Sequence, residues 1–134
     1  MESHIEAFVG RPYMAVLSTV GAGGNPQATT IWYAFEDGAF WFYVSRDSRK
    51  ARNLRGNPHV ALTIDEREWP YKQAVIYGEA VEMPLDADRA RRMAVHYLGE
   101  EVGGALDDEM MADLDRVGFR VEPRRVYWQD FSGG

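Results

Sequence analysis

Residues 26–62 read PQATTIWYAFEDGAFWFYVSRDSRKARNLRGNPHVAL. Two β-prone runs, residues 27–36 and 40–45, flank Asp37-Gly38, and an Asp-Gly pair between such runs is typical of a β-hairpin. A helix is expected to follow directly over residues 48–55, ended by a Gly-Asn-Pro run. The sequence therefore predicts a strand–turn–strand–helix unit near the centre of the chain.

The segments on either side of this unit predict hairpins rather than parallel crossovers. The order β-β-β-α-β-β-α-β, without the glycine fingerprint of a doubly wound sheet, is typical of an antiparallel barrel with helices packed outside. We therefore expect a mainly β (β+α) fold, formed by residues 1–134 as a single domain. The remaining elements are expected as strands over residues 13–20, 59–65, 73–83 and 119–131, and as helices over residues 3–9, 86–98 and 107–114.

Composition excludes several classes of function. The chain has 134 residues and no cysteine, so disulfides, thiolate metal sites and cysteine nucleophiles are excluded. Its three histidines are scattered without metal-ligand spacing, so no metal site is expected. No apolar run approaches the roughly 20 residues of a membrane span, and the N-terminus carries no secretory signal, so we expect a cytoplasmic protein with no membrane partner. The net charge of −6 argues against nucleic acid as a partner.

The charge is unevenly spread along the chain. Residues 46–55 hold five basic residues against one acidic residue, in a chain whose net charge is −6. A solvated helix face would account for such a run. However, Ser48, Arg49 and Lys50 occupy the expected first helical turn, where free backbone N–H groups and the helix dipole favour an anion, and arginine can hold a phosphate through two parallel hydrogen bonds. The sequence therefore predicts a phosphate site at this helix start.

The strand over residues 40–45 is apolar on both faces. Phe40, Phe42 and Val44 point to one side, whereas Trp41 and Tyr43 point to the other. An antiparallel sheet normally shows water one face, so this strand requires a second covering layer. The chain's own helices or a partner subunit would supply that layer. The four tryptophans and seven tyrosines of so small a chain favour the partner.

Several patterns occur in order along the chain. They are Gly24-Asn25-Pro26-Gln27 followed by Thr29 to Trp32, Ser48-Arg49-Lys50-Ala51-Arg52-Asn53-Leu54 followed by Asn57-Pro58, Tyr77 to Glu82, and Arg124 to Trp128. Together they resemble the pyridoxamine-phosphate oxidase family and, more broadly, the flavin and deazaflavin oxidoreductases built on the FMN-binding split barrel. The resemblance implies a six-stranded antiparallel split β-barrel with flanking helices. It also implies a homodimer with two cofactor sites at the interface.

The resemblance further implies a role for each matching position. The implied cofactor is FMN or the deazaflavin coenzyme F420, whose phosphate would be held at the turn of Ser48, Arg49 and Lys50. The family assigns no catalytic acid or base that we can place on this chain. The other implied cofactor-binding residues are Asn53 in support of the phosphate, Thr29, Thr30, Ile31 and Trp32 along the ring, Val44 and Ser45 beside the ribityl phosphate, and Gln73 from the opposing subunit.

Departures from the oxidase pattern favour F420 over FMN and argue against oxidation of vitamin B6. The oxidase branch carries an arginine at the start and a lysine at the end of its cofactor strand, where this chain has Thr29 and Ala34. The chain is also shorter, so the C-terminal substrate-binding segment of those oxidases is expected to be missing. The pattern Thr29-x-x-Trp32-Tyr33 is similar to the branch that uses F420.

We therefore expect an oxidoreductase that transfers hydride between F420 or FMN and a small-molecule substrate. The alternative is a non-catalytic protein that holds a flavin, a deazaflavin or haem for storage or sensing. Against haem, the strands expected to line the pocket carry no well-placed histidine or cysteine to serve as an axial ligand.

Overall fold

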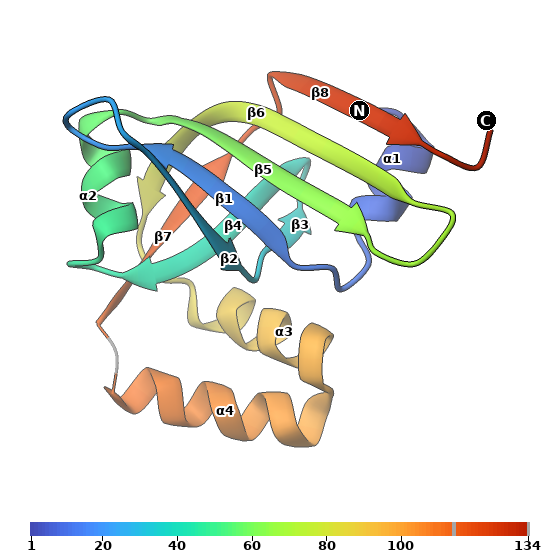
Figure 1. Ribbon diagram of the computed structural model, residues 1–134. Coiled ribbons are helices and arrows are strands. Elements are labelled where there is room, and N and C mark those ends of the chain that lie inside the picture. The colour runs from blue at the N-terminus through green and yellow to red at the C-terminus, as the bar shows by residue number, and fades with distance from the viewer. Residues whose placement is uncertain (114, 134) are drawn as a thin grey trace.

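The computed structural model describes residues 1–113 and 115–133, and within these ranges an antiparallel sheet curls around the core (Figure 1). Helices lie at its ends and below it. The strands are β1 (Ala15–Val20), β2 (Pro26–Ile31), β3 (Ala34–Glu36), β4 (Ala39–Ser45), β5 (His59–Glu66), β6 (Lys72–Met83), β7 (Arg116–Val121) and β8 (Arg125–Asp130), and the helices are α1 (Ser3–Val9), α2 (Arg49–Gly56), α3 (Ala87–Leu98) and α4 (Glu100–Asp113).

The strand order is β2-β1-β5-β6-β7-β4-β3, with β8 also paired to β6. Strand β6 is shared by both halves of the curl, because residues 72–77 pair with β8 whereas residues 80–83 pair with β7. Gly78 lies at the changeover, where a Cβ atom would sit 2.5 Å from the carbonyl oxygen of Glu122. Only glycine permits so close an approach of two strands. Strands β3, β4 and β7 consequently pass behind β1 and β5 (Figure 1).

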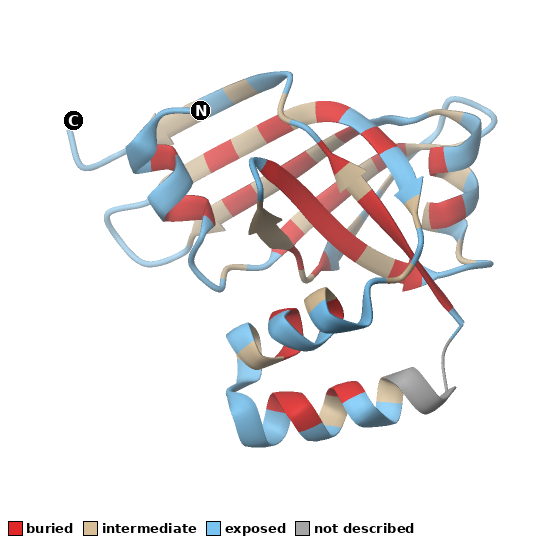
Figure 2. Cartoon of the chain, turned by 180° about the vertical axis from the view of Figure 1, so that it is seen from behind, coloured by how far each residue is buried: buried red, intermediate tan, exposed pale blue. Residues whose placement is uncertain are grey.

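The core fills the space inside the curl. Buried and less buried residues alternate along β1, β5 and β6, whereas β4 and β7 are buried along most of their length (Figure 2). Helices α1 and α2 lie at opposite ends of the sheet and each turns apolar side chains into this core. In α2 these are Ala51 and Leu54, which the spacing of the sequence predicts. The largest fully buried side chains are Phe40, Phe42, Phe119, Leu17, Leu62, Ile64, Ile76, Val9 and Val121.

The expected fold class is confirmed, but the described residues form eight strands in place of the expected six. The segment 27–36 divides into β2 and β3 because the backbone N–H of Tyr33 donates to the hydroxyl of Tyr97 on α3 (3.1 Å), not to a neighbouring strand. The last expected strand divides into β7 and β8 around Pro123, which has no N–H to donate. Both divisions let the sheet turn a corner.

Helices α3 and α4 form a layer over the outer face of β4 (Figure 1). The ring of Trp41 is 8% exposed, and the guanidinium carbon of Arg89 on α3 lies 3.7 Å from its centroid. The prediction that a partner subunit covers Trp41 and Tyr43 is therefore wrong, because α3 and α4 cover this face within one chain. The expected helix over residues 107–114 is also longer than predicted, since α4 begins at Glu100, and Leu114 lies outside the described residues.

Glu36 on β3 ties the sheet to α3. Its carboxylate accepts hydrogen bonds from Arg89 (2.8 Å) and from Arg92 (3.1 and 2.9 Å). These contacts, led by the hydrogen bond from Arg92, lower the pKa of Glu36 below its ordinary value of 4.5. Because the carboxylate is favoured in the folded state, this anchor is complete above pH 4.5 and is lost as the pH falls through the lowered pKa.

We expect Glu36→Gln to lower the free energy of unfolding at pH 7 by about 2 kcal/mol, since charge-assisted hydrogen bonds to the two arginines are lost. The deficit should shrink as the pH falls below 4.5, because wild-type Glu36 then becomes protonated as well. Urea unfolding of both proteins at several values between about pH 3 and pH 7 measures how this difference in unfolding free energy depends on pH. A deficit that does not depend on pH would contradict the electrostatic explanation.

Candidate functional site

A cavity of about 290 Å³ opens where β2, β4 and β7 meet the start of α2 and the α3–α4 layer. This volume lies near the lower end of the ~300–1,000 Å³ typical of ligand pockets, so one chain encloses only part of a large ligand. The described residues that line it are Ile31, Trp32, Tyr43, Val44, Ser45, Ser48, Lys50, Met93, Met110 and Arg116.

The start of α2 forms one polar wall of the cavity. Ser48 caps the helix, because its hydroxyl oxygen accepts a hydrogen bond from the backbone N–H of Ala51 (3.2 Å). The first backbone N–H groups of a helix have no partner within the helix, and they carry the positive end of its dipole. Lys50 is half-buried in this first turn and lines the cavity. The wall therefore combines oriented donors with a full positive charge.

Trp32, Ile31 and Met93 supply an apolar part of the cavity lining. The ring of Trp32 stacks on Tyr97 of α3, with centroids 4.9 Å apart and planes 8° from parallel. The Tyr97 hydroxyl donates to the carbonyl oxygen of Tyr13 (2.7 Å), and burial raises the pKa of Tyr97 to about 12. Tyr97 therefore stays protonated at neutral pH and holds Trp32 in a fixed orientation.

A second cation reaches the cavity from β7. The side chain of Arg116 is 8% exposed, and Nη2 lies 3.8 Å from a carboxylate oxygen of Asp107 on α4. The cavity thus presents an apolar wall, hydroxyl groups and two cationic side chains. This set of donors fits a ligand with a planar apolar part and an anionic group such as a phosphate.

Six of the predicted cofactor-binding residues meet in this cavity. They come from three separate elements, so the fold brings together what the sequence places up to 19 positions apart. The six are Ile31, Trp32, Val44, Ser45, Ser48 and Lys50.

The other predicted residues lie elsewhere in this chain. Arg49 is exposed and Thr30 is exposed on the outer face of β2, whereas the half-buried Thr29 is on the opposite face. Asn53 donates to the Thr19 hydroxyl (3.1 Å) and to the Gln27 side chain (3.0 Å). It therefore braces α2 against β1 and β2 and does not support the first helical turn directly.

Gln73 lies at the start of β6, at the end of the sheet opposite α2 (Figure 1). Its side-chain amide donates to Gln129 of β8 (3.3 Å). Within one chain it is remote from the cavity, so a contact with the cofactor requires a second subunit.

Four cavity residues were not predicted from the sequence: Tyr43, Met93, Met110 and Arg116. The methionines resemble core filler, and only the packing of α3 and α4 against β4 brings them to the cavity. Arg116 carried only a weak signal, because it is the charged residue directly before the apolar run Val117-Gly118-Phe119 of β7 but follows the charged Asp115.

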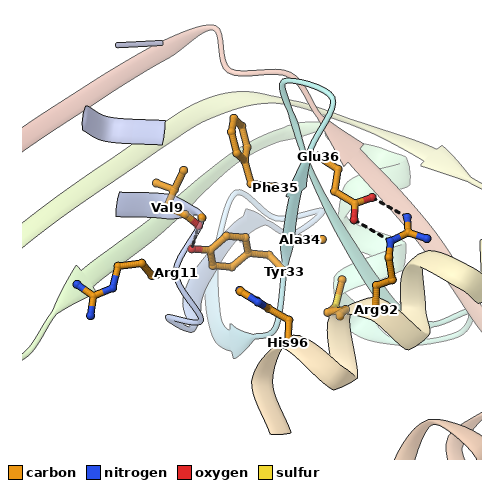
Figure 3. A pocket seen from close by; sticks show the side chains of 10 residues that line it. Val9, Arg11, Tyr33, Ala34, Phe35, Glu36, Arg92 and His96 are labelled. Carbon is orange, nitrogen blue, oxygen red and sulfur yellow. Dashed lines mark hydrogen bonds and ion pairs between the residues drawn. The ribbon is translucent and has the colours of Figure 1, made fainter. Parts of the chain in front are cut away.

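A second cavity, of about 210 Å³, lies between α1, β3 and α3, and Figure 3 shows its lining. The Tyr33 hydroxyl donates to the carbonyl oxygen of Val9 (2.6 Å), and Arg92 is held by Glu36. Arg11 points away from the centre of this cavity (Figure 3). Of the polar side chains that line this second cavity, Tyr33, Glu36 and Arg92 therefore already have hydrogen-bond partners within the protein.

In the described part of the chain, no group of three or more histidine, aspartate or glutamate side chains is placed to hold a metal ion. No described helix is both long enough and apolar enough to span a membrane.

The chain is similar in sequence to a known protein family. A family model described as "Pyridoxamine 5'-phosphate oxidase" matches residues 1–130. The pyridoxine/pyridoxamine 5'-phosphate oxidase of Bacteroides thetaiotaomicron is 32% identical over 156 residues, which cover 96% of this chain and 72% of that protein. Alignments to three such oxidases span 62% to 72% of their length, so about a third of each has no counterpart here.

Solved structures share the fold. A conserved hypothetical protein from Mycobacterium tuberculosis superposes with a TM-score of 0.81 at 28% identity, covering 98% of this chain and 86% of that one. An F420 reductase superposes with a TM-score of 0.74 at 24% identity, covering 91% of this chain and 94% of that one. The expected split-barrel architecture is thereby confirmed.

Proposed function

The chain belongs to the pyridoxamine 5'-phosphate oxidase family, and from this premise we propose that it is an oxidoreductase that transfers hydride between F420 or FMN and a small organic substrate. The observation that carries the proposal is the cavity at the start of α2. Its lining combines apolar and aromatic side chains with hydroxyl groups and cationic side chains. Such a lining matches the two chemical halves of these cofactors, a planar ring and a phosphate.

The cofactor would supply the hydride chemistry, and the chain's residues would bind and orient it. Lys50, the Ser48 region and the free N–H groups of α2 would hold the phosphate. Trp32, fixed by its stacking on Tyr97, would form an apolar surface for the ring and exclude water from one side. No side chain is assigned as catalytic acid or base.

F420 is the proposed cofactor ahead of FMN. Two positions of the cofactor strand that are charged in the oxidase branch are Thr29 and Ala34 here, so neither supplies a cation for the smaller cofactor. Each missing charge-assisted contact would cost about 1.5–3 kcal/mol of FMN affinity. The likeness to an F420 reductase supports the same order.

The proposal is tested by titrating the apo-protein with F420 and with FMN under identical conditions, followed by hydride-transfer assays with each. We expect saturable binding of both, with the lower Kd for F420. Purification with one equivalent of bound FMN would reverse the proposed order. Failure of both cofactors to bind would overturn the proposed function.

Haem storage receives no support from the cavity. The three histidines of the chain are His4, His59 and His96, all among the described residues, and none lines the cavity at α2. A sharp Soret band in the visible spectrum of protein reconstituted with haem, abolished by a cavity substitution such as Trp32→Ala, would revive this alternative.

Lys50→Ala should weaken cofactor binding about tenfold or more. A direct charge-assisted hydrogen bond to the phosphate contributes roughly 1.5–3 kcal/mol to the binding free energy. Arg55→Ala is the matched control, since it removes one positive charge from the same helix. Arg55 is already bound to Glu82 (2.7 Å) and to the carbonyl oxygen of Arg46 (2.9 Å), and it does not line the cavity. Equal losses of affinity for the two variants would mean that the basic run acts only through diffuse charge.

We further propose that the chain acts as a homodimer. One row of side chains crosses the outer face of the sheet in register, from Thr30 through Val16, Thr63 and Val75 to Tyr127. All five are uncharged, each is exposed or half-buried, and no described helix covers this face (Figure 1). A second copy would cover such a face and would bring its own Gln73 from outside the chain.

Light scattering is expected to give twice the chain mass of 15.2 kDa at micromolar concentration. Val75→Arg should yield monomer, because a charge is placed in the middle of the uncharged row. Val81→Arg, on the same strand but 55% exposed outside that row, should leave the dimer intact. A wild-type protein that scatters as a monomer would contradict the proposed assembly.

A further inference from the structure

Three exposed aromatic side chains gather at the end of the sheet opposite α2, where β5 turns into β6 (Figure 1). Trp69 is 70% exposed, and Tyr71 and Phe131 are each 46% exposed. The ring of Tyr71 meets that of Trp69 edge-on, with centroids 5.3 Å apart, and it meets that of Phe131 in the same way at 6.3 Å. Exposed aromatic rings in contact with one another are typical of a surface that another molecule covers. We call these three residues the aromatic group.

The aromatic group is continuous with the face on which the homodimer is proposed. The backbone N–H of Phe131 donates to the carbonyl oxygen of Tyr71 (2.9 Å), so the pairing of β6 with β8 extends one residue beyond the two strands. Side chains alternate between the two faces along a strand. Tyr71 and Phe131 therefore point to the same side of the sheet as Val75 and Tyr127, the pair that belongs to the uncharged row.

Two copies can place this face against itself in two ways, because the two-fold axis that relates them lies in the plane of the interface. An axis along the strands sets each end of the sheet beside the same end of the partner. An axis across the strands brings opposite ends together, so that the end with the aromatic group meets the α2 end of the partner.

Charge distinguishes these two arrangements. The run 46–55 at the α2 end has five basic residues and one acidic residue, whereas residues 65–72 at the other end have three acidic and two basic residues, with Asp130 paired to Lys72 beside them. An axis along the strands would bring one basic run towards the other, and like charges that face each other across an interface are costly. An axis across the strands joins the basic run to the acidic loop and is therefore favoured.

We propose that the aromatic group of a second copy closes the α2 cavity over the planar part of its ligand, with Trp69 as the main contact. The inference rests on the proposed function, including the homodimer, and names a wall of the site that one chain does not supply. A cavity of about 290 Å³ encloses only part of a large ligand, so the remainder is open to water in a single chain. Aromatic side chains pack on planar rings by their faces and edges, so planar conjugated molecules are the class of ligand that this wall selects.

Trp69→Ala tests the contact, with FMN and riboflavin as the probes. Both should bind about tenfold more weakly or worse, and by the same factor, because the lost contact is with the ring system that they share and not with the phosphate. Trp69→Phe should retain most of the affinity. Val102→Ala is the control, since Val102 is a 59% exposed apolar residue of α4 that does not line the cavity. Unchanged affinity in Trp69→Ala, or a loss confined to FMN, would overturn the inference.

A mixture of two variants shows which copy supplies Trp69. Trp69→Ala and Lys50→Ala should each bind FMN weakly as homodimers. When their subunits exchange at random, about half of the dimers are mixed, and each of these has one site that combines an intact cavity with an intact aromatic group. About a quarter of all sites should therefore regain wild-type FMN affinity. If no site regains it, Trp69 does not act across the interface and the inference is wrong.

Charge reversal separates this inference from the proposed function, because it requires no cofactor. Glu68→Arg in the loop and Arg52→Glu on α2 each place like charges at both contacts of the dimer. Each variant alone should raise the Kd of the dimer about tenfold or more at low salt, and an equimolar mixture should restore the dimer, since opposite charges then meet at both contacts. Light scattering across a dilution series measures this. Recovery on mixing would support the docking of the loop on α2 even if neither F420 nor FMN binds, whereas no weakening by either variant, or no recovery, would overturn it.

Discussion

Phe42→Ala should lower the free energy of unfolding by about 3–5 kcal/mol, the range found when a buried phenylalanine is truncated. Phe42 is fully buried on β4, and its ring stacks on that of Phe119, its partner on β7, with centroids 5.7 Å apart. Both strands are fixed on either side, so the core cannot collapse into the space that the ring leaves. Because domains are stable by only about 5–15 kcal/mol, a large part of the total would be lost.

Urea unfolding followed by tryptophan fluorescence measures this loss, with Val81→Ala as the control. Val81 is an apolar strand residue of β6, but it is 55% exposed, so its truncation should cost less than about 1 kcal/mol. Similar losses for the two variants would mean that β4 and β7 do not form the centre of the core.

The hairpin and the helix of residues 26–62 follow from local chemistry, and both were predicted. The Asp37-Gly38 turn joins β3 to β4, with Asp37 and Gly38 both at positive φ, as their residue types allow. Helix α2 spans Arg49–Gly56 where a helix over residues 48–55 was predicted, and Ser48 is its N-cap and not part of its first turn. The positions at which strands are interrupted depend on tertiary contacts, however. The break between β2 and β3 at Tyr33 depends on the hydroxyl of Tyr97, 64 positions away, and no local sequence pattern predicts it.

The candidate site divides in the same way. The wall formed by Ser48 and Lys50 was predicted, because a cationic helix start is a local feature. Arg116 and Met110 reach the cavity only through the packing of α3, α4 and β7, which hydrophobic periodicity does not specify. Asn53 shows the converse, since a polar residue in the right helix was expected at the phosphate and instead bonds to Thr19 and Gln27. Sequence spacing places residues on an element, whereas the neighbours of that element decide which contacts they make.

Gly103→Ala should lower the free energy of unfolding by about 3 kcal/mol and should also weaken ligand binding. Gly103 lies where α4 packs against α3, and a Cβ atom there would overlap the carbonyl oxygen of Ala94 and lie 2.7 Å from its carbonyl carbon. These are backbone atoms of a helix and cannot move aside independently, so the cost should reach the upper part of the range for overpacking. Relief requires α3 and α4 to separate.

Gly104→Ala is the matched control for this prediction, one position along the same helix. A Cβ atom at Gly104 would meet only the guanidinium of Arg91, 2.8 Å from Nη2, and this flexible end of a side chain can turn away. Because alanine favours a helix over glycine by about 1 kcal/mol, Gly104→Ala should be neutral or stabilising. Separation of α3 from α4 displaces Met93 and Met110, which line the cavity from the two helices. Cofactor affinity should therefore fall in Gly103→Ala and stay unchanged in Gly104→Ala, and hydrogen exchange of α4 amides should accelerate only in the former. If Gly103→Ala loosened α4 without changing affinity, the helical layer would be a cover for β4 alone and would have no part in the binding site.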